Sequence, residues 1–507
     1  MSARNRRNVG KEAAVFDARA HASRFSVKGV GAAGITASGL LATFLLTVFL
    51  GCGGQSVTDP ARVLSDTSEV PARHAAAIGM AEGILGQEET IRLLRRMIVS
   101  DGYALESREA AWKTLERLDR PQLARLLELN LPRLSAPRWR TRICELIAEE
   151  VWIEMTPTLI RAWARKMPGF LGDPADRPER LALIEMYGET QLPKVLVQVM
   201  LDADPVVAAN LRARCWELLV AEGRLEVVVD LLKNADVDPN DGLFRDLRRI
   251  AGATDVIPTN REEIAWMRAL CLEENEAFLD AVIEAVGQIP AARRSDLEPR
   301  DLGIIVGARR IDPALLKMDE AELEAILSPR IDPDGRRFYT ADFTGHRGTF
   351  SERFRNRREK LDWGDLLALV VASEAIALEP VRRHLFDHAE RDLLDTGTEF
   401  GGVIGIDDRG RFVVEEFAPR TRSGDIRFVA PQALFDAGYS GLFHFHHHAQ
   451  DYENRKYAGP HLGDFGYAES TRANCLVFTF IDSRTLNADW YRHGGMVVDL
   501  GQISRPD

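Results

Sequence analysis

Residues 441–446 have the sequence Gly-Leu-Phe-His-Phe-His, and this stretch decides the fold of the C-terminal part of the 507-residue chain. Successive side chains of a β-strand point to opposite faces, so His444 and His446 share one face while Phe443 and Phe445 point into an apolar layer. Two neighbouring imidazoles on one face can converge on a single metal ion. The stretch therefore predicts a strand that presents a pair of metal ligands.

The segments on both sides of this strand add further candidate residues. Residues 449–459 are polar and predict a loop. This loop returns the chain to Asp464, a candidate third ligand. The run 475–481, Cys-Leu-Val-Phe-Thr-Phe-Ile, predicts another strand. Upstream, Glu399 opens a strand predicted over residues 400–406, whose glycines allow neighbouring backbones to approach closely.

Two imidazoles, a carboxylate and a separate glutamate are the components of a hydrolytic zinc site. Three protein ligands leave a fourth position for water, and a nearby carboxylate can take the proton of that water. Histidine clusters are also found as fortuitous or loosely metal-binding features. The zinc interpretation therefore depends on the glutamate before the cluster and the aspartate after it.

At these residues the chain resembles the JAMM metallopeptidases, also called the JAB or MPN domain family. Their pattern is a glutamate at a strand start, then His-x-His-Pro, then a loop with Ser-x-x-Asp. The resemblance spans residues 363–507 and implies that Glu399 is the catalytic glutamate and that zinc is the cofactor. It implies as zinc ligands His444, His446 and Asp464. The implied substrates are proteins or peptides, cleaved at peptide or isopeptide bonds.

Three departures from the family pattern bear on turnover. His447 stands where the family has proline, and the loop before Asp464 is longer than usual. His461 replaces the family serine, which helps to stabilise the developing oxyanion. Two roles are open for His461: it can donate a hydrogen bond to an oxyanion, or it can act as a further ligand and close the site.

The first 52 residues predict export and membrane attachment. Seven basic residues within the first 28 precede an uncharged stretch over residues 29–50. Phe49-Leu50-Gly51-Cys52 resembles a bacterial lipobox, which implies lipidation at Cys52. An uncleaved membrane anchor and a soluble product are the alternatives. In the first two cases the bulk of the chain is exported and tethered at the bacterial cell envelope, and residues 53–80 form a polar linker.

Residues 81–330 show apolar side chains at three- and four-residue spacing, which predicts helices. Corresponding helix starts at Arg108, Arg140, Arg180 and Arg212 recur at intervals of 32, 40 and 32 residues. Helix pairs with this period resemble HEAT-type repeats. Such a solenoid offers a face for a protein partner, although it can also serve as a spacer. The arginine-rich residues 331–362 are typical of a linker or loop, with a docking surface as the alternative.

Composition bounds the remaining functions. The chain has 77 acidic and 65 Lys or Arg residues, a net charge of −12 that argues against general nucleic-acid binding. Its five cysteines have the spacing of neither a zinc ribbon nor a disulfide scaffold.

The expected fold is multidomain α+β: an α-helical, HEAT-like solenoid followed by a JAMM-like α/β domain with a mixed sheet. The leading function is zinc-dependent hydrolysis of peptide or isopeptide bonds at the cell envelope. The alternatives are a noncatalytic protein-binding scaffold and a zinc-storage or zinc-sensing lipoprotein.

Overall fold

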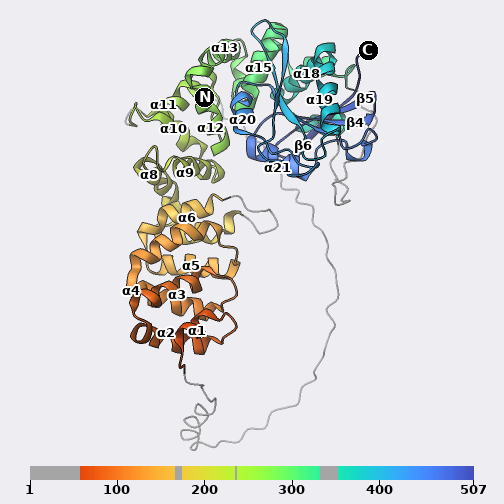
Figure 1. Ribbon diagram of the computed structural model, residues 1–507. Coiled ribbons are helices and arrows are strands. Elements are labelled where there is room, and N and C mark those ends of the chain that lie inside the picture. Colours follow the sequence, from red (N-terminus) through yellow and green to blue (C-terminus); the bar gives the residue numbers. More distant parts are fainter. Residues whose placement is uncertain (1–56, 166–173, 235–236, 332–351) are drawn as a thin grey trace, which may run out of the picture. The chain divides into compact units, whose positions relative to one another are not determined.

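A computed structural model describes residues 57–165, 174–234, 237–331 and 352–507. Residues 57–393 are mostly helical, and a mixed six-stranded sheet with further helices follows (Figure 1). The expected α+β multidomain class is therefore confirmed. The export signal with Cys52 and most of the arginine-rich segment 331–362 lie outside the described residues. Among the described helices, none is long and apolar enough to cross a membrane.

The N-terminal helices begin earlier than the sequence pattern indicated. The linker expected over residues 53–80 contains α1 (Pro60–Ser65) and the start of α2 (Pro71–Leu85). Proline at the first position favours each helix start. The buried His74 explains the packing of α2, because its ring nitrogens contact the hydroxyl of Ser107 at 2.9 Å and two backbone carbonyls of the α1 end.

The helical region continues through a long series of elements. They are α3 (Gln87–Val99), α4 (Leu105–Asn130), α5 (Pro137–Glu149), α6 (Thr156–Trp163), α7 (Pro178–Tyr187), α8 (Leu192–Asp202), α9 (Ala209–Ala221), α10 (Leu225–Lys233), α11 (Gly242–Thr254), α12 (Arg261–Leu270), α13 (Glu276–Val286), α14 (Ala291–Arg294), α15 (Pro299–Ile311) and α16 (Glu320–Leu327). Up to α13, each helix packs on helices close to it in the chain, as α3 does on α4 and α8 on α9. This local packing is the pattern expected of a helical repeat region.

Buried arginines mark equivalent places in three of these helices. Arg108, Arg140 and Arg212 each stand fourth in their helix, and each is at most 5 % exposed. Arg140 pairs with the buried Glu179, and Arg212 pairs with Asp241 at 2.6 Å. The predicted helix start at Arg180 differs, since in α7 the buried charged residue is Glu179. Arg140 and Arg212 thus each connect their helix to the start of a later one, whereas Arg108 pairs with Asp101, which precedes its own helix.

The C-terminal sheet has the strand order β2-β1-β3-β4-β5-β6. Its strands are β1 (Gly401–Ile406), β2 (Phe412–Phe417), β3 (Phe443–His448), β4 (Cys475–Asp482), β5 (Thr485–Arg492) and β6 (Met496–Ser504). The helices of this region are α17 (Phe354–Arg357), α18 (Trp363–Ala377), α19 (Glu379–Leu393), α20 (Gln432–Gly438) and α21 (Leu462–Thr471). The β3–β4 pair is parallel and the other pairs are antiparallel, which confirms a mixed sheet.

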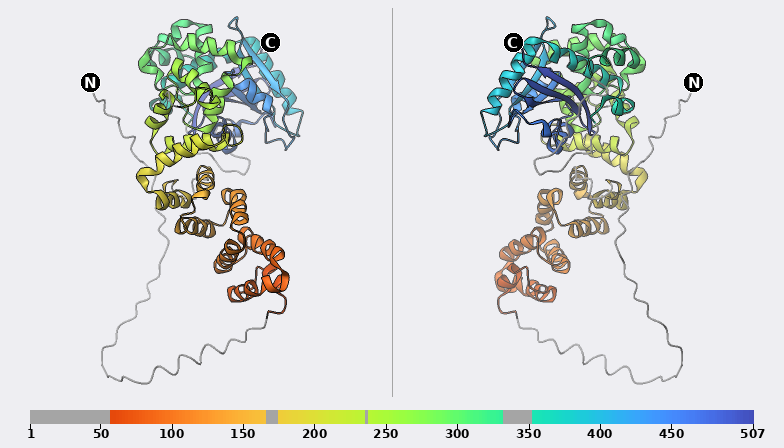
Figure 2. Two further views of the ribbon diagram at one scale, coloured as in Figure 1. Left: turned by 90° about the vertical axis from the view of Figure 1, so that its left-hand side faces the viewer. Right: turned by 90° about the vertical axis from the view of Figure 1, so that its right-hand side faces the viewer.

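Helices α18 and α19 lie beside this sheet, with α18 against β6 and α19 against β2 and β3 (Figures 1 and 2). Helix α18 is apolar nearly all round and almost entirely buried, as expected for a helix enclosed by other elements. Its start is fixed by a capping box in which Asp362 accepts from the Asp365 backbone N–H at 2.7 Å. Helices α18 and α19 therefore cover one face of the sheet, and the opposite face of β3 is open to α21 and its loops.

Helix α15 belongs structurally to both parts of the chain. It packs on α12 and α13 of the helical region and on α18. A Cβ on Gly303 would lie 2.3 Å from the Gly441 carbonyl oxygen, so the backbones of α15 and the β3 approach touch. Arg300, also on α15, is buried and contacts Asp365 at 3.0 Å and Asn474 at 3.0 Å. Helix α15 is therefore joined to the sheet region by a buried ion pair and by close backbone contact.

Candidate metal centre

Strand β3 and the start of α21 bring two histidines and an aspartate together. The His446 Nε2 atom lies 3.2 Å from His448 Nε2 and 3.2 Å from Asp464 Oδ1. The His448 Nε2 atom lies 3.6 Å from Asp464 Oδ2. His446 and His448 share a face because they are two residues apart on a strand. Among the described residues, these three are the group whose donor atoms are close enough to hold one metal ion.

The separations between the donor atoms fit a tetrahedral ion. Nitrogen and oxygen ligands at about 2.0–2.1 Å from zinc in a tetrahedral site stand about 3.3–3.4 Å from one another. The His446–His448 and His446–Asp464 Oδ1 separations of 3.2 Å are close to that value, while the 3.6 Å separation joins His448 to the other carboxylate oxygen, Oδ2. Two imidazole nitrogens and a carboxylate oxygen are also a donor set used by zinc and other first-row metals. The three residues are therefore close enough to hold one metal ion.

Neighbouring groups orient two of the three donors. The His448 Nδ1 atom donates to the Tyr457 carbonyl at 2.9 Å, which leaves the Nε2 lone pair directed at the site. The Asp464 Oδ2 atom accepts from the backbone N–H of His461 at 2.7 Å, while Oδ1 faces His446. The carboxylate stands in the first turn of α21, where the helix dipole favours negative charge.

The charges of these groups attract a cation. Burial disfavours the imidazolium of His448, but its hydrogen bond to Asp464 and the charge of that carboxylate raise the pKa of His448 to about 9. Burial alone would raise the pKa of Asp464, but His446 and His448 hold it well below its usual range. An arrangement that holds a proton between these groups also suits a metal ion, which must displace that proton.

His444 does not belong to this group, so the predicted ligand pair was displaced by one step along the strand. Its Nδ1 atom lies 2.8 Å from the Tyr467 hydroxyl, and its Nε2 atom faces Gly438 on α20. Burial lowers the pKa of His444 to about 4, so the ring is neutral. The candidate ligand that sequence reasoning missed is His448, although continuing the alternation from His446 by one more step would have reached it.

His447 points to the opposite face of β3. Its Nε2 atom lies 3.0 Å from His388 Nδ1 on α19, and its ring packs against Phe445 and Phe478. Burial lowers the pKa of His388 to about 4. The four histidines of residues 444–448 thus have different surroundings and do not form one loose cluster. His446 and His448 belong to the candidate metal group, His444 contacts Tyr467, and His447 packs in the core.

Glu399 lines the same cavity as His446 and Asp464. It directly precedes β1, and β1 pairs with β3 so that Gly401 stands opposite His446. Gln450 donates to the Glu399 carboxylate at 3.2 Å. Burial raises the pKa of Glu399, although the charges of His448 and His446 and a backbone N–H from Phe428 oppose the shift. The residue is a buried carboxylate within reach of the same cavity as the metal group.

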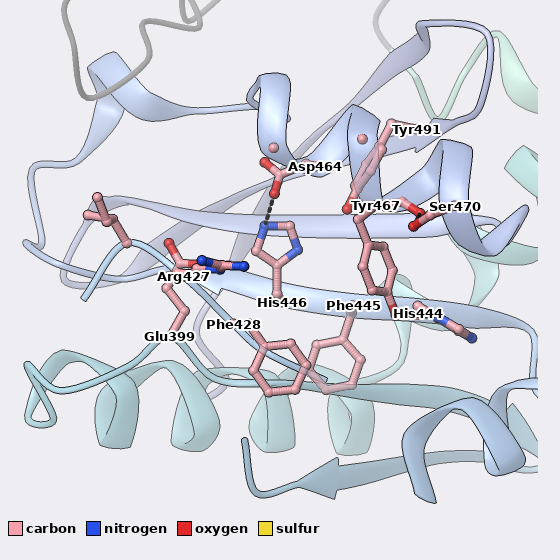
Figure 3. A pocket seen from close by; sticks show the side chains of 13 residues that line it. Glu399, Arg427, Phe428, His444, Phe445, His446, Asp464, Tyr467, Ser470 and Tyr491 are labelled. Carbon is pink, nitrogen blue, oxygen red and sulfur yellow. Dashed lines mark hydrogen bonds and ion pairs between the residues drawn. The ribbon is translucent and has the colours of Figure 1, made fainter. Parts of the chain in front are cut away.

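A cavity of about 470 Å³ joins these residues (Figure 3). His446, Asp464 and Glu399 line it together with aromatic side chains and one cation. The further lining residues are Ile426, Arg427, Phe428, His444, Phe445, Gly463, Gly466, Tyr467, Ser470 and Tyr491. Figure 3 shows Glu399 and Arg427 on one side of His446, with Tyr467, Ser470 and His444 on the other. The metal group therefore has space for a substrate beside it.

His461, which stands at the family serine position, caps the start of α21. Its ring stacks on the His448 ring, with the centroids 4.4 Å apart and the planes inclined by 14°. Among the described residues, His461 is not part of the group of converging donor atoms. The group of converging donor atoms among the described residues therefore consists of His446, His448 and Asp464.

No protein-family model, curated protein or solved structure matches this chain. The described residues thus establish a helical region, a mixed sheet and a possible His446–His448–Asp464 metal site, without a family.

Proposed function

We propose that the C-terminal region is a zinc-dependent hydrolase of peptide or isopeptide bonds. The observation that supports this best is the close approach of His446, His448 and Asp464 next to a cavity that His446, Asp464 and the buried Glu399 line. The proposal also rests on the resemblance to the JAMM pattern, with His446 and His448 in place of His444 and His446 as the ligand pair. A glutamate still precedes the first strand, the histidines are still two residues apart on a neighbouring strand, and Asp464 still stands at a helix start.

Zinc is the ion proposed for this site. When bound, it would polarise the scissile carbonyl and lower the pKa of a water molecule to about 7. His446, His448 and Asp464 would hold it, and the Tyr457 carbonyl would keep the His448 ring in the required tautomer.

Glu399 is the proposed proton-transfer group. It takes a proton from the attacking water and delivers it to the leaving amine. Burial favours this role because a carboxyl with a raised pKa is closer to neutral pH, where it can both accept and return a proton. Gln450 and the Phe428 backbone keep the carboxylate in place.

His461 is the proposed hydrogen-bond donor to the developing oxyanion. It takes the family serine position, and its stacking on His448 keeps it next to the metal group. The alternative role as a fourth ligand predicts a closed site without turnover. The His461→Ala variant separates the two roles: a donor loses activity and keeps its zinc, whereas a ligand loses zinc affinity.

The first experiment is the metal content and activity of the full chain beside two variants. We expect one tightly held zinc per chain, lost in Asp464→Ala. We expect hydrolysis of a peptide and isopeptide panel to fall by about 10²–10⁴-fold in Glu399→Gln while zinc stays bound. Zinc binding without turnover would favour the noncatalytic scaffold. Several weakly held ions per chain would favour zinc storage.

We also propose that the chain is attached to the bacterial cell envelope through Cys52. A protein partner is proposed to bind the helical region. The support is the lipobox-like sequence and the local helix packing. Labelled palmitate should enter the protein in a bacterial host and be absent from Cys52→Ala. Label retained in that variant would rule out lipidation at Cys52.

A further inference from the structure

The segment Gly424–Phe428 is fastened along the residues that lead to Glu399. Gly424 N–H donates to the Gly397 carbonyl at 3.1 Å, and Gly424 forms an isolated parallel bridge with Thr398. The Thr398 hydroxyl lies 3.3 Å from the Arg427 carbonyl. Gln450 donates to both the Asp425 carbonyl, at 2.7 Å, and Glu399. Hydrogen bonds thus connect the segment Gly424–Phe428, which forms part of the cavity rim, to the residues next to Glu399.

Arg427 is presented from this rim into the cavity. Its backbone is fixed on both sides, by Thr398 at its own carbonyl and by the contact of Phe428 with Glu399. Its exposed side chain lines the cavity together with Glu399 and His446 (Figure 3). In the part of the chain that the structure describes, this guanidinium forms no ion pair within 4 Å. By contrast, Arg422 in the same loop is paired with Asp395.

An unpaired guanidinium here has a chemical consequence. The cavity already contains the carboxylates of Glu399 and Asp464, and the chain as a whole is acidic. Arg427 is the one Lys or Arg side chain among the residues that line the cavity, so it is the side chain placed to receive an anionic substrate group away from the proposed zinc. The guanidinium is planar and offers parallel N–H donors that match a carboxylate, so it binds one with both strength and orientation.

We propose that Arg427 is a specificity-determining residue that binds a substrate carboxylate next to the scissile amide. This inference rests on the proposed hydrolase function. The carboxylate comes either from an acidic side chain or from a free chain terminus, and both sources present the same group to Arg427. Ile426 and Phe428, the chain neighbours of Arg427, also line the cavity and offer apolar surface to the rest of the substrate residue.

Binding of matched probes tests the inference independently of turnover. The full chain with Glu399→Gln is titrated by calorimetry with acetyl-Ala-Glu-Ala-amide and with its Gln counterpart. Acetyl-Ala-Ala with a free carboxylate and its amide form the second pair. We expect one of the carboxylate probes to bind roughly tenfold more tightly than its neutral partner, and the pair that shows the preference identifies the source of the carboxylate. The preference should vanish in Arg427→Gln and persist in Arg420→Gln, an exposed arginine of the same loop that does not line the cavity.

Different results would refute the proposed hydrolase function and the proposed role of Arg427. Carboxylate preference lost in Arg427→Gln, with no probe cleaved by the native chain, would support the binding site and refute the hydrolase. Cleavage without any carboxylate preference would refute the role of Arg427 alone. A preference that persists in Arg427→Gln would also refute it, because the carboxylate would then be bound by the metal. Zinc content should be equal in all variants, which excludes a folding defect.

Discussion

At the scale of single residues, His448 and His444 occupy the same face of β3 but have different partners. His448 converges with His446 and Asp464, whereas His444 contacts Tyr467. We expect His448→Ala to lose most of the bound zinc and His444→Ala to retain one zinc per chain. Metal analysis after dialysis against a mild chelator measures this. Loss of zinc in both variants, or in His444→Ala alone, would restore the ligand pair first inferred from the sequence.

Strand alternation is a local property, so the sequence predicts that His444 and His446 share one face of β3, and the candidate ligand His448 lies on that face too. Which two of three same-face histidines converge with Asp464 is not local. It depends on where residues 449–461 return the chain over the strand, and a loop with polar composition does not specify that distance. Arg427 escaped prediction for a related reason, since its place beside Glu399 follows from loop contacts far apart in the sequence.

Asp392, on α19, provides a residue-scale test of burial. Burial and the charge of Glu399 raise the pKa of this carboxyl from 3.8 to about 9, although the Phe400 backbone N–H opposes the shift. The folded chain therefore holds a proton that the unfolded chain releases between these two values. Within that window Asp392 costs stability as pH rises, by about 1.4 kcal/mol per pH unit.

We accordingly expect Asp392→Asn to be more stable than the native chain, with a gain that grows from pH 5.5 to pH 8. Urea unfolding at both pH values measures the difference. Asp387→Asn is the matched control, because this residue is exposed on the same helix. A gain that is equal at both pH values would show that the Asp392 carboxyl is already ionised in the folded chain.

At the scale of elements, the glycines of β1 explain how Glu399 comes to lie near the metal group. A Cβ on Gly402 would stand 2.0 Å from the Glu415 carbonyl oxygen and 2.7 Å from the Phe445 ring. At Gly405, on the same strand, nothing lies within 4 Å. Close approach, inferred for all three glycines from the sequence, is therefore required at Gly401 and Gly402 and not at Gly405.

The two glycines provide a matched pair of alanine variants. Gly402→Ala forces the β2 backbone or the Phe445 ring to move, so we expect a loss of about 1–3 kcal/mol in unfolding free energy. Gly405→Ala should change stability by less than about 0.5 kcal/mol. Chemical denaturation of both variants decides the matter. Equal effects at the two positions would mean that β1 tolerates a side chain near Glu399.

At the scale of the whole molecule, α15 links the helical region to the sheet. The sequence suggested a boundary within residues 331–362, because composition changes there, and a C-terminal domain over residues 363–507. Composition reports local solvation and not tertiary contact. Buried Arg300 and Gly303 are at α15, well before that boundary, yet they touch Asp365, Asn474 and the Gly441 backbone.

This arrangement makes a specific prediction for truncated chains. A fragment of residues 363–507 retains Asp365 but lacks Arg300, which leaves a buried carboxylate with Arg492 as its remaining cation. It also uncovers the apolar surface of α18 that packs on α15. We expect this fragment to melt without cooperativity and to bind zinc poorly, whereas residues 291–507 should melt cooperatively and bind one zinc.

Adding the Arg300→Met substitution to residues 291–507 separates charge from packing. If the buried cation matters most, the substituted fragment should lose stability by about 3–5 kcal/mol, because a buried acid cluster remains unneutralised. If apolar packing of α15 matters most, the substitution should cost much less than removal of the helix. Cooperative melting of residues 363–507 at the temperature of the longer fragment would contradict both accounts. It would place the domain boundary after α15, because the sheet and its metal group would then form without any element of the helical region.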